Sequence, residues 1–189
     1  MNWNAKVPKP AETFPVLTTK RLRLRQVEPR DVAALHACFG DTEAMRYWNF
    51  PASRTLSETA GLLKLLGKTS SPYAQLAWAI ADKATDECLG MVNYHHREAR
   101  NRRLEIGYAV APKHQRKGLA TEAVSGLLKY CAETLNVHRV EAFICPENVA
   151  SIRLVERSKF RCEGGPLKDY WLIGEQFRSV WVYGLILTP

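Results

Sequence analysis

The sequence predicts an α+β fold, with helices packed against one mixed β-sheet. Residues 21–27 alternate strictly between apolar and polar side chains, which is typical of a half-exposed strand. From Leu119 to Cys131, apolar residues recur every four positions, which is typical of a helix with one buried face. The predicted elements follow the order strand, two helices, a meander of three strands, helix, strand, helix and two strands. We therefore expect about six or seven strands and about four helices.

The first half of the chain is predicted to hold the first strand, two helices and the meander. In the first strand, Leu22 and Leu24 share one face, and the opposite face carries three basic residues: Arg21, Arg23 and Arg25. Pro29 and Asp31 open a helix, and Thr55 with Glu58 has the spacing of a capping box ahead of a second helix. Residues 41–53, between these helices, are predicted to be irregular. The meander strands are expected at residues 75–82, 88–96 and 104–110.

The second half is predicted to add a strand at residues 139–145, a short helix at 149–158 and two final strands. One of these begins at Phe160 and the other spans residues 179–187, which are rich in β-branched and aromatic residues. We expect residues 164–178 to form an arm between them. Residues 1–16 are proline-rich and aperiodic, so an N-terminal extension is expected before a single domain over residues 17–189.

Composition narrows the classes of function. The formal net charge of +8 favours an anionic partner. No apolar run approaches the roughly 20 residues that cross a bilayer, so no membrane partner is expected. The five cysteines are widely spaced without a Cys-x-x-Cys pair, which indicates reduced thiols and a cytoplasmic location. Aromatic residues do not interleave with basic ones as a nucleic-acid stacking platform requires, so DNA is not an expected partner.

Residues 104–121 carry the strongest functional signal. A strand leads through a proline corner and a basic turn into the helix that starts near Leu119. Unpaired N–H groups at a helix start, together with the positive end of the helix dipole, suit a phosphate group. Gly118 lets a ligand approach the backbone, and Arg116 and Lys117 add positive charge. The stretch predicts a site for a pyrophosphate.

Three motifs in the chain resemble a known family. The turn Gln115-Arg116-Lys117-Gly118-Leu119-Ala120 resembles motif A of the GCN5-related N-acetyltransferases (GNAT), Arg/Gln-x-x-Gly-x-Gly/Ala. Asn148-Val149-Ala150-Ser151 follows at the family's spacing, and residues 17–25 are similar to the opening strand of the ribosomal-protein N-terminal acetyltransferases. The resemblance implies a mostly antiparallel GNAT sheet with a splay between its fourth and fifth strands, here 104–110 and 139–145.

The resemblance implies transfer of an acetyl group from acetyl-CoA to a primary amine, by direct attack in a ternary complex. A protein N-terminal α-amine is the expected acceptor. The turn would hold the pyrophosphate, the splayed strand would pair with the pantetheine arm, and the Val110 N–H would stabilise the oxyanion. A bulge at Gly107 is expected to open that strand. The implied cosubstrate-binding residues are Tyr108, Ala109, Val110, Gln115, Arg116, Lys117, Gly118, Leu119, Ala120, Thr121, Asn148 and Ser151.

Two residues are candidates for catalysis. Glu105 alternates with the apolar residues on either side and is the best-placed base for the amine; a solvent-facing glutamate paired with Arg102 or Arg103 is the alternative. Many relatives use a tyrosine to protonate the departing thiolate, and Val155 stands at the matching position. The resemblance therefore assigns the proton donor to Ser151, with a role as a helix cap as the alternative.

The acceptor is the least determined part of the prediction. By resemblance it lies between residues 45–51 and the arm at 164–178, and the expected acceptor-binding residues are Tyr47, Trp48, Phe50, His95 and Tyr170. A small amine, a polyamine or an antibiotic remains an alternative acceptor, and a non-catalytic acyl-CoA-binding module is an alternative of another class. His95 and His96 are neighbours on a strand and are expected to point to opposite faces, so no metal site is expected. The sequence leaves monomer and homodimer both open.

Overall fold

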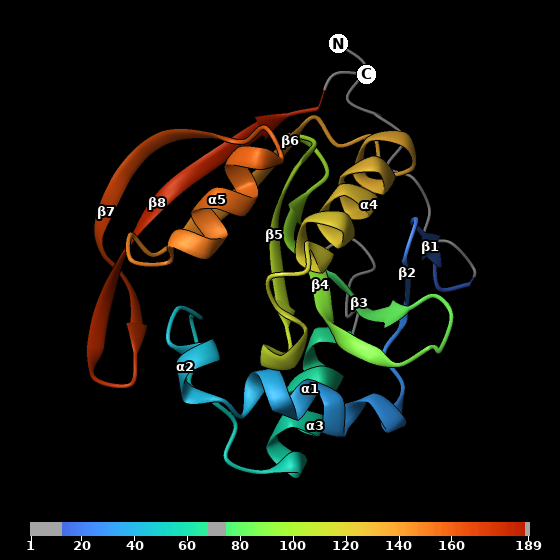
Figure 1. The fold of residues 1–189 in the computed structure, drawn as a ribbon. Coiled ribbons are helices and arrows are strands. Elements are labelled where there is room, and N and C mark those ends of the chain that lie inside the picture. The colour runs from blue at the N-terminus through green and yellow to red at the C-terminus, as the bar shows by residue number, and fades with distance from the viewer. Residues whose placement is uncertain (1–12, 68–74, 188–189) are drawn as a thin grey trace.

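The structure is a computed structural model that describes residues 13–67 and 75–187, so most of the predicted extension at residues 1–16 lies outside the described residues. Its strands form one sheet in the order β1-β2-β3-β4-β5-β6-β8-β7 (Figure 1). The strands are β1 (Leu17–Thr18), β2 (Leu22–Gln26), β3 (Leu76–Asp82), β4 (Cys88–Glu98), β5 (Arg103–Val110), β6 (Arg139–Ile144), β7 (Arg161–Ile173) and β8 (Gln176–Ile186). All strand pairs are antiparallel except β5 with β6, which confirms the mixed, mostly antiparallel sheet.

The described residues also form five α-helices, one more than the sequence predicts. They are α1 (Val32–Phe39), α2 (Thr42–Met45), α3 (Leu56–Gly67), α4 (Leu119–Glu133) and α5 (Val149–Arg157), with 3₁₀ turns at Pro29–Asp31 and Pro112–His114. The additional helix, α2, lies in the segment predicted to be irregular. Asp41 caps it, because its side chain accepts hydrogen bonds from the backbone N–H groups of Glu43 and Ala44.

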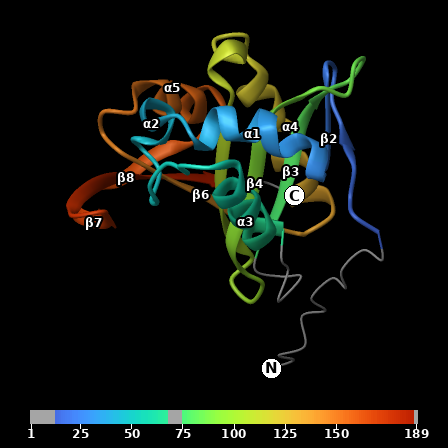
Figure 2. The same cartoon turned by 90° about the horizontal axis from the view of Figure 1, so that it is seen from below.

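Helices cover both faces of the sheet (Figure 2). Trp78 and Ile80 of β3 belong to a core cluster that includes α4 and α5 residues, while Ala77 and Ala79 belong to a second cluster with α1 and α3. Alternate residues of one strand therefore enter opposite cores, as the two-residue period of a strand requires. This arrangement explains why β3 reads as a nearly continuous apolar run.

Burial on both faces corrects the prediction for Arg25. Its side chain does lie opposite Leu24, but it is 7% exposed, and its guanidinium contacts Asp31 at 2.7 Å and Asp86 at 3.0 Å. The pKa of Arg25 is raised mainly by the hydrogen bond to Asp31. The alternation of β2 identified the face correctly, but that face is covered by the segment leading into α1.

The end of the sheet also differs from the prediction. Residues 164–178 were expected to form an arm, but they continue β7 and begin β8, with the turn at residues 174–175. The result is a long two-stranded hairpin that curves away from the helices and then reaches towards α2 (Figure 1). Asp169 therefore belongs to a strand, and Glu175 lies in the turn.

The predicted splay lies between β5 and β6. These strands pair in parallel at Arg103–Arg139, Leu104–Val140 and Glu105–Glu141. β5 stays paired with β4 as far as Val110, while β6 pairs with β8 as far as Ile144. Beyond Glu105, the two inner strands are therefore held by their outer neighbours and not by each other. The edge of β5 from Ile106 to Val110 faces the gap.

Candidate active site

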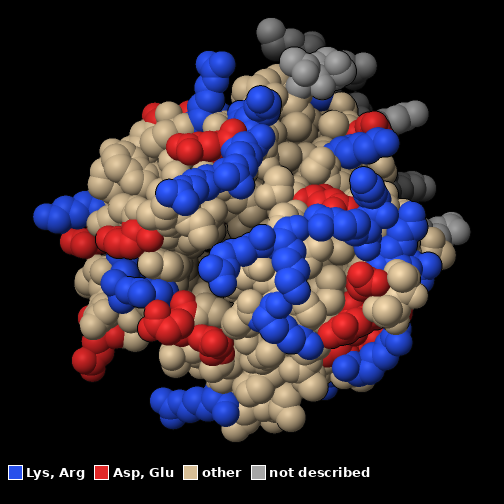
Figure 3. Space-filling view, in the orientation of Figure 1, with Lys and Arg blue, Asp and Glu red and all other residues tan. Residues whose placement is uncertain are grey.

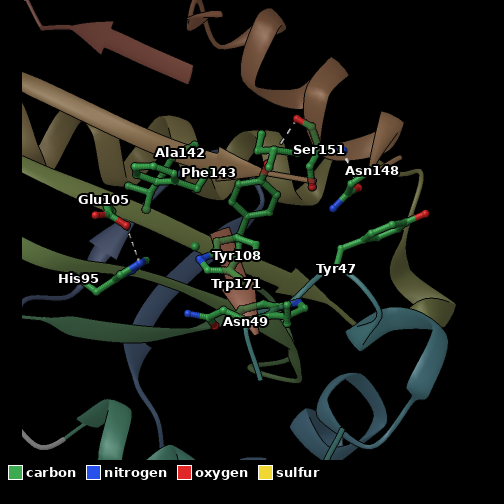
Figure 4. A pocket seen from close by; sticks show the side chains of 14 residues that line it. Tyr47, Asn49, His95, Glu105, Tyr108, Ala142, Phe143, Asn148, Ser151 and Trp171 are labelled. Atoms are coloured by element: carbon green, nitrogen blue, oxygen red, sulfur yellow. Dashed lines mark hydrogen bonds and ion pairs between the residues drawn. The ribbon is translucent and has the colours of Figure 1, made fainter. Parts of the chain in front are cut away.

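A pocket of about 660 Å³, including its open mouth, lies in the splay. The residues that line it come from the loop before α3, from β4, β5 and β6, from the start of α5 and from the hairpin: Tyr47, Trp48, Asn49, His95, Glu105, Ile106, Gly107, Tyr108, Ala142, Phe143, Ile144, Asn148, Ser151 and Trp171. Glu105 and His95 lie at one end, and Ser151 and Asn148 lie at the other (Figure 4).

The pattern of lining residues shows that the pocket passes between the strands. Consecutive residues of β5 (Ile106, Gly107 and Tyr108) and of β6 (Ala142, Phe143 and Ile144) all line it. Successive side chains of a strand point to opposite faces of the sheet, so three in a row can border one pocket only along the strand edge. The backbone edge of β5 is thus open to a ligand that lies in the gap.

Glu105 faces the pocket and pairs with histidines rather than with arginines. Its carboxylate oxygens lie 3.4 Å from His95 Nε2 and 3.1 Å from His96 Nδ1. The two arginines that were expected as alternative partners contact other residues. Arg102 donates to the Asn136 side chain, and Arg103 forms salt bridges with Glu98 and Glu141. Burial raises the pKa of Glu105, but the hydrogen bonds and charges of the two histidines outweigh it and lower the pKa overall. Glu105 is therefore an ionised carboxylate at neutral pH.

The expectation that His95 and His96 point to opposite faces is wrong. The pairing of β4 with β5 shifts between His95 and Glu98, and His96 has a φ of 48°, in the left-handed region. This irregularity turns the His96 ring to the side of Glu105, where it packs edge-to-face on the His95 ring at 4.9 Å. Alternation along a strand fails as a guide where one residue leaves the extended conformation.

Ser151 lies in the first turn of α5. The cap of this helix is Asn148, whose Oδ1 accepts a hydrogen bond from the Ser151 N–H at 3.2 Å. Asn148 thus takes the capping role that the sequence left open for both residues. The Tyr108 hydroxyl lies 3.5 Å from the Ser151 carbonyl oxygen, and burial raises the pKa of Tyr108 to about 12, so this phenol is neutral.

The turn at residues 115–118 has the geometry of an anion site. Arg116 and Gly118 have φ angles of 60° and 74°, so left-handed residues alternate within the turn, which directs backbone N–H groups towards one point. Gly118 is the N-cap of α4, and within the described residues no side chain caps that helix. Its first N–H groups therefore remain available. Lys and Arg side chains cross the middle of this face of the molecule (Figure 3).

Two contacts fix this turn from outside. The Gln115 side chain donates a hydrogen bond to the Val110 carbonyl at 3.0 Å, which joins the turn to the end of β5. Arg21, ahead of β2, donates to the Lys117 carbonyl at 3.0 Å and pairs with Glu122 of α4 at 2.7 Å. The Arg21 guanidinium also lies 3.6 Å from the point where a Gly118 Cβ would stand. No local pattern predicts this role of Arg21, because Arg21 and Lys117 are nearly a hundred residues apart in the chain.

Gly107 does not form the bulge that the sequence predicts. The pairing of β4 with β5 runs without a shift through Asn93 and Gly107. The glycine instead leaves room for a side chain, because a Cβ at Gly107 would lie 2.7 Å from Asn93 Oδ1. Asn93 is 4% exposed, its amide nitrogen lies 3.3 Å from His95 Nδ1, and its Oδ1 lacks a hydrogen-bond partner within the described part of the chain.

The expected acceptor-binding residues divide into two groups. Tyr47, Trp48 and His95 line the pocket, whereas Tyr170 stacks on Phe143 at 5.3 Å and Phe50 packs on Phe39 and Trp48 in the second core. The structure adds Asn49, Phe143 and Trp171 to the lining. Asn49 and Trp171 belong to the two segments that were expected to hold the acceptor, whereas Phe143 carries no local sequence signal, because only the fold brings its strand to the pocket.

Known proteins share both the sequence and the fold. A family model described as acetyltransferase (GNAT) domain matches residues 21–161. The chain is 32% identical to the uncharacterised N-acetyltransferase YoaA of Bacillus subtilis, over 80% of this chain and 85% of the relative. It is 29% identical to the [ribosomal protein uS5]-alanine N-acetyltransferase of Escherichia coli, over 86% of each chain. The structure of spermidine N-acetyltransferase from Vibrio cholerae, in complex with CoA and spermine, matches with a TM-score of 0.76 at 25% identity, covering 89% of this chain and 96% of that one.

The family model spans most of the chain, and the anion-binding turn and the open edge of β5 are the features that the family's cosubstrate, acetyl-CoA, requires. Among the described residues, no helix is long and apolar enough to cross a membrane. The chain belongs to the GNAT acetyltransferase family and is an N-acetyltransferase.

Proposed function

We propose that this enzyme acetylates protein N-terminal α-amines with acetyl-CoA. The observation that supports this acceptor most is the charge of the pocket. Among the described residues that line it, Glu105 is the one carboxylate, and five others are aromatic: Tyr47, Trp48, Tyr108, Phe143 and Trp171. Such a pocket suits one amine followed by an uncharged or apolar side chain.

The alternative acceptor is a polyamine, as in the spermidine acetyltransferases that the chain resembles. A polyamine carries a positive charge every few bonds, and each charge that leaves water needs a partner. A pocket with a single carboxylate supplies one partner. The net charge of +8 further disfavours a polycation. The open mouth of the pocket also admits a peptide chain, whose remaining residues can stay in water.

Each end of the pocket has a role in this proposal. Acetyl-CoA supplies the reactive thioester. The Glu105 carboxylate attracts the ammonium form of the acceptor and takes its proton, directly or through a water molecule, so that a neutral amine attacks the carbonyl carbon. The Val110 N–H, at the end of the open edge of β5, would stabilise the oxyanion. When the C–S bond breaks, the Ser151 hydroxyl donates its hydrogen to the departing sulfur and regains one from the acceptor nitrogen, which loses its second proton as the amide forms.

The acceptor is tested by comparing kcat/KM for peptides with a free N-terminus against spermidine. A matched peptide with a formylated N-terminus and an internal lysine is the control. We expect kcat/KM for the peptide with a free α-amine to exceed that for spermidine by about 100-fold. This ratio corresponds to about two to three kcal/mol, the cost of leaving one charge of spermidine without a partner in the pocket. Equal or better turnover of spermidine would reject the protein acceptor and favour the polyamine.

The residue roles are tested with Glu105→Gln and Ser151→Ala. Each should lower kcat by roughly 10²–10⁴ and leave the acetyl-CoA Kd nearly unchanged. Because Asn148 provides the cap of α5, Ser151→Ala should also leave the melting temperature nearly unchanged. Tyr108→Phe is the matched control, since it removes the neighbouring hydroxyl only. A larger loss with Tyr108→Phe than with Ser151→Ala would reassign the proton donor to Tyr108.

A further inference from the structure

Three potential metal ligands meet at the Glu105 end of the pocket. His95 Nε2 and His96 Nδ1 contact different oxygens of Glu105, and the donor atoms of all three residues lie within 4.8 Å of one another. The left-handed backbone of His96 creates this arrangement, because an extended residue would direct the ring to the other face of the sheet. Two imidazoles and a carboxylate are a common set of protein ligands for Zn²⁺.

The separations fit a small transition-metal ion. Zinc bonds of about 2.0–2.1 Å place neighbouring donor atoms of a tetrahedron roughly 3.3–3.4 Å apart. The two histidine–glutamate separations, 3.4 Å and 3.1 Å, lie close to that value. Because the two histidines contact different oxygens of Glu105, the donor atoms, which lie within 4.8 Å of one another, must come closer together to bind one ion. His96 is able to make this adjustment because its side chain is 70% exposed.

Asn93 contacts the ring nitrogen of His95 that faces away from Glu105. Histidines that bind metals usually donate their other ring N–H to a carbonyl or carboxylate, which fixes the ring and its tautomer. The buried Asn93 amide lies 3.3 Å from His95 Nδ1, and its Oδ1 lacks a partner within the described residues. A half-turn of this amide brings Oδ1 to the His95 Nδ1–H. The lone pair of His95 Nε2 then points towards Glu105, where an ion would lie.

We propose that His95, His96 and Glu105 form a binding site for a divalent transition-metal ion such as Zn²⁺, and that the ion inhibits acetyl transfer. With three protein ligands, one coordination position stays open to water. An ion held by Glu105 neutralises the carboxylate that attracts the acceptor amine. The inhibitory half of this inference rests on the proposed function, whereas the binding half does not.

Metal binding is tested by calorimetric titration of ZnCl₂ into the full chain. We expect one ion per chain with a Kd in the micromolar range, and a rise in melting temperature at saturating zinc. His96→Ala should weaken binding by at least about tenfold, since it removes one of three ligands. His138→Ala, which removes an exposed histidine outside the cluster, should bind zinc as the unchanged protein does. Equal zinc binding by both variants, or none by the unchanged protein, would overturn the site.

Inhibition is tested separately, with the best acceptor found. Zinc should raise the KM for the amine and leave the KM for acetyl-CoA unchanged. The turn at residues 115–118 follows the far end of β5, away from His95, His96 and Glu105. His96 contacts Glu105, so each variant is compared with itself, and the ratio of the rates of His96→Ala with and without zinc should be close to one. Zinc binding without inhibition would overturn the inhibitory half alone. Zinc binding in a protein that acetylates no amine would leave the site standing and reject the proposed function.

Discussion

Arg21 contacts the turn at residues 115–118, and this contact predicts that Arg21 affects the affinity for acetyl-CoA. Arg21 donates to the Lys117 carbonyl and pairs with Glu122, whose carboxylate also accepts from the Thr19 hydroxyl at 2.6 Å. The segment ahead of β2 is thereby tied to the start of α4. Arg21→Ala removes the two guanidinium contacts and leaves the turn without a side-chain hydrogen bond from this segment, while the N–H of residue 21 still donates to Glu122 at 2.7 Å. Because the turn must be ordered to present its N–H groups, acetyl-CoA should then bind more weakly.

The size of the effect follows from the exposure of the contacts. The Arg21 side chain is 46% exposed, so its ion pair with Glu122 contributes about 0–1 kcal/mol. The charged hydrogen bond to the Lys117 carbonyl adds about 1 kcal/mol after the same allowance for solvent. A total of about 1–2 kcal/mol corresponds to roughly 5–30-fold in the Kd for acetyl-CoA. The free energy of unfolding should fall by only about 1 kcal/mol.

Calorimetric titration of acetyl-CoA at constant salt measures this effect. Arg23→Ala is the matched control, because Arg23 has the same charge, is 49% exposed and contacts Asp86 at 3.9 Å instead of the turn. If Arg21→Ala binds acetyl-CoA within twofold of the unchanged protein, the turn does not depend on Arg21. If Arg23→Ala weakens binding equally, the effect is one of net charge, and it should then decline as salt is added.

Three further substitutions test other parts of the structure. Arg25→Met leaves the buried Asp31 carboxylate without its main partner and should lower the free energy of unfolding in urea by about 3–5 kcal/mol, against under about 0.5 kcal/mol for Arg23→Met. Lys159→Gly should raise the free energy of unfolding by about 1 kcal/mol, because Lys159 has a φ of 71° at the end of α5. The Phe160 N–H donates to the Val155 carbonyl there, as at other helix ends with a left-handed residue. No gain in the same urea titration would contradict this prediction. Gly107→Ala should lower the free energy of unfolding by about 1–3 kcal/mol, because the new Cβ would lie 2.7 Å from Asn93 Oδ1. A crystal structure of the variant in which Asn93 has not moved would refute this explanation.

Local signals predicted the elements whose residues share one environment. The helix α4 and the turn before it were predicted from the four-residue apolar repeat and from Gly118, because both depend on neighbours in the chain. The hairpin was only partly predicted. Most of β7 is exposed on both faces, so its residues show no alternation, and Gly164 and Gly165 read as irregular chain. Arg25 is the opposite case. Its face of the strand was predicted correctly, but its side chain was expected to be exposed and is buried. Alternation indicates an exposed face only in a sheet that has one face in solvent.

The candidate site was predicted in its parts, while its assembly depended on the fold. Glu105, Ser151 and Asn148 each follow from a motif or from alternation. Phe143 does not, because a single aromatic residue in a strand gives no sign of which gap it will border. The pairing of Glu105 with His96 was beyond sequence reasoning for a different reason. It depends on one left-handed residue at a shift in strand pairing, and although histidine adopts this conformation more often than most residues, its presence alone does not predict it.

The end of the pairing between β5 and β6 connects these features. Glu141 holds the paired end together, because it contacts Arg103 at 3.1 Å and Arg139 at 2.8 Å. Glu105 stands at the last paired position, so the ladder fixes its backbone while its side chain faces the open pocket. The next residues of β5 have a free edge for the pantetheine arm. One point in the sheet therefore positions the proposed base, the open edge of β5 and the proposed metal ligands, and a pairing longer by two residues would cover the start of that edge.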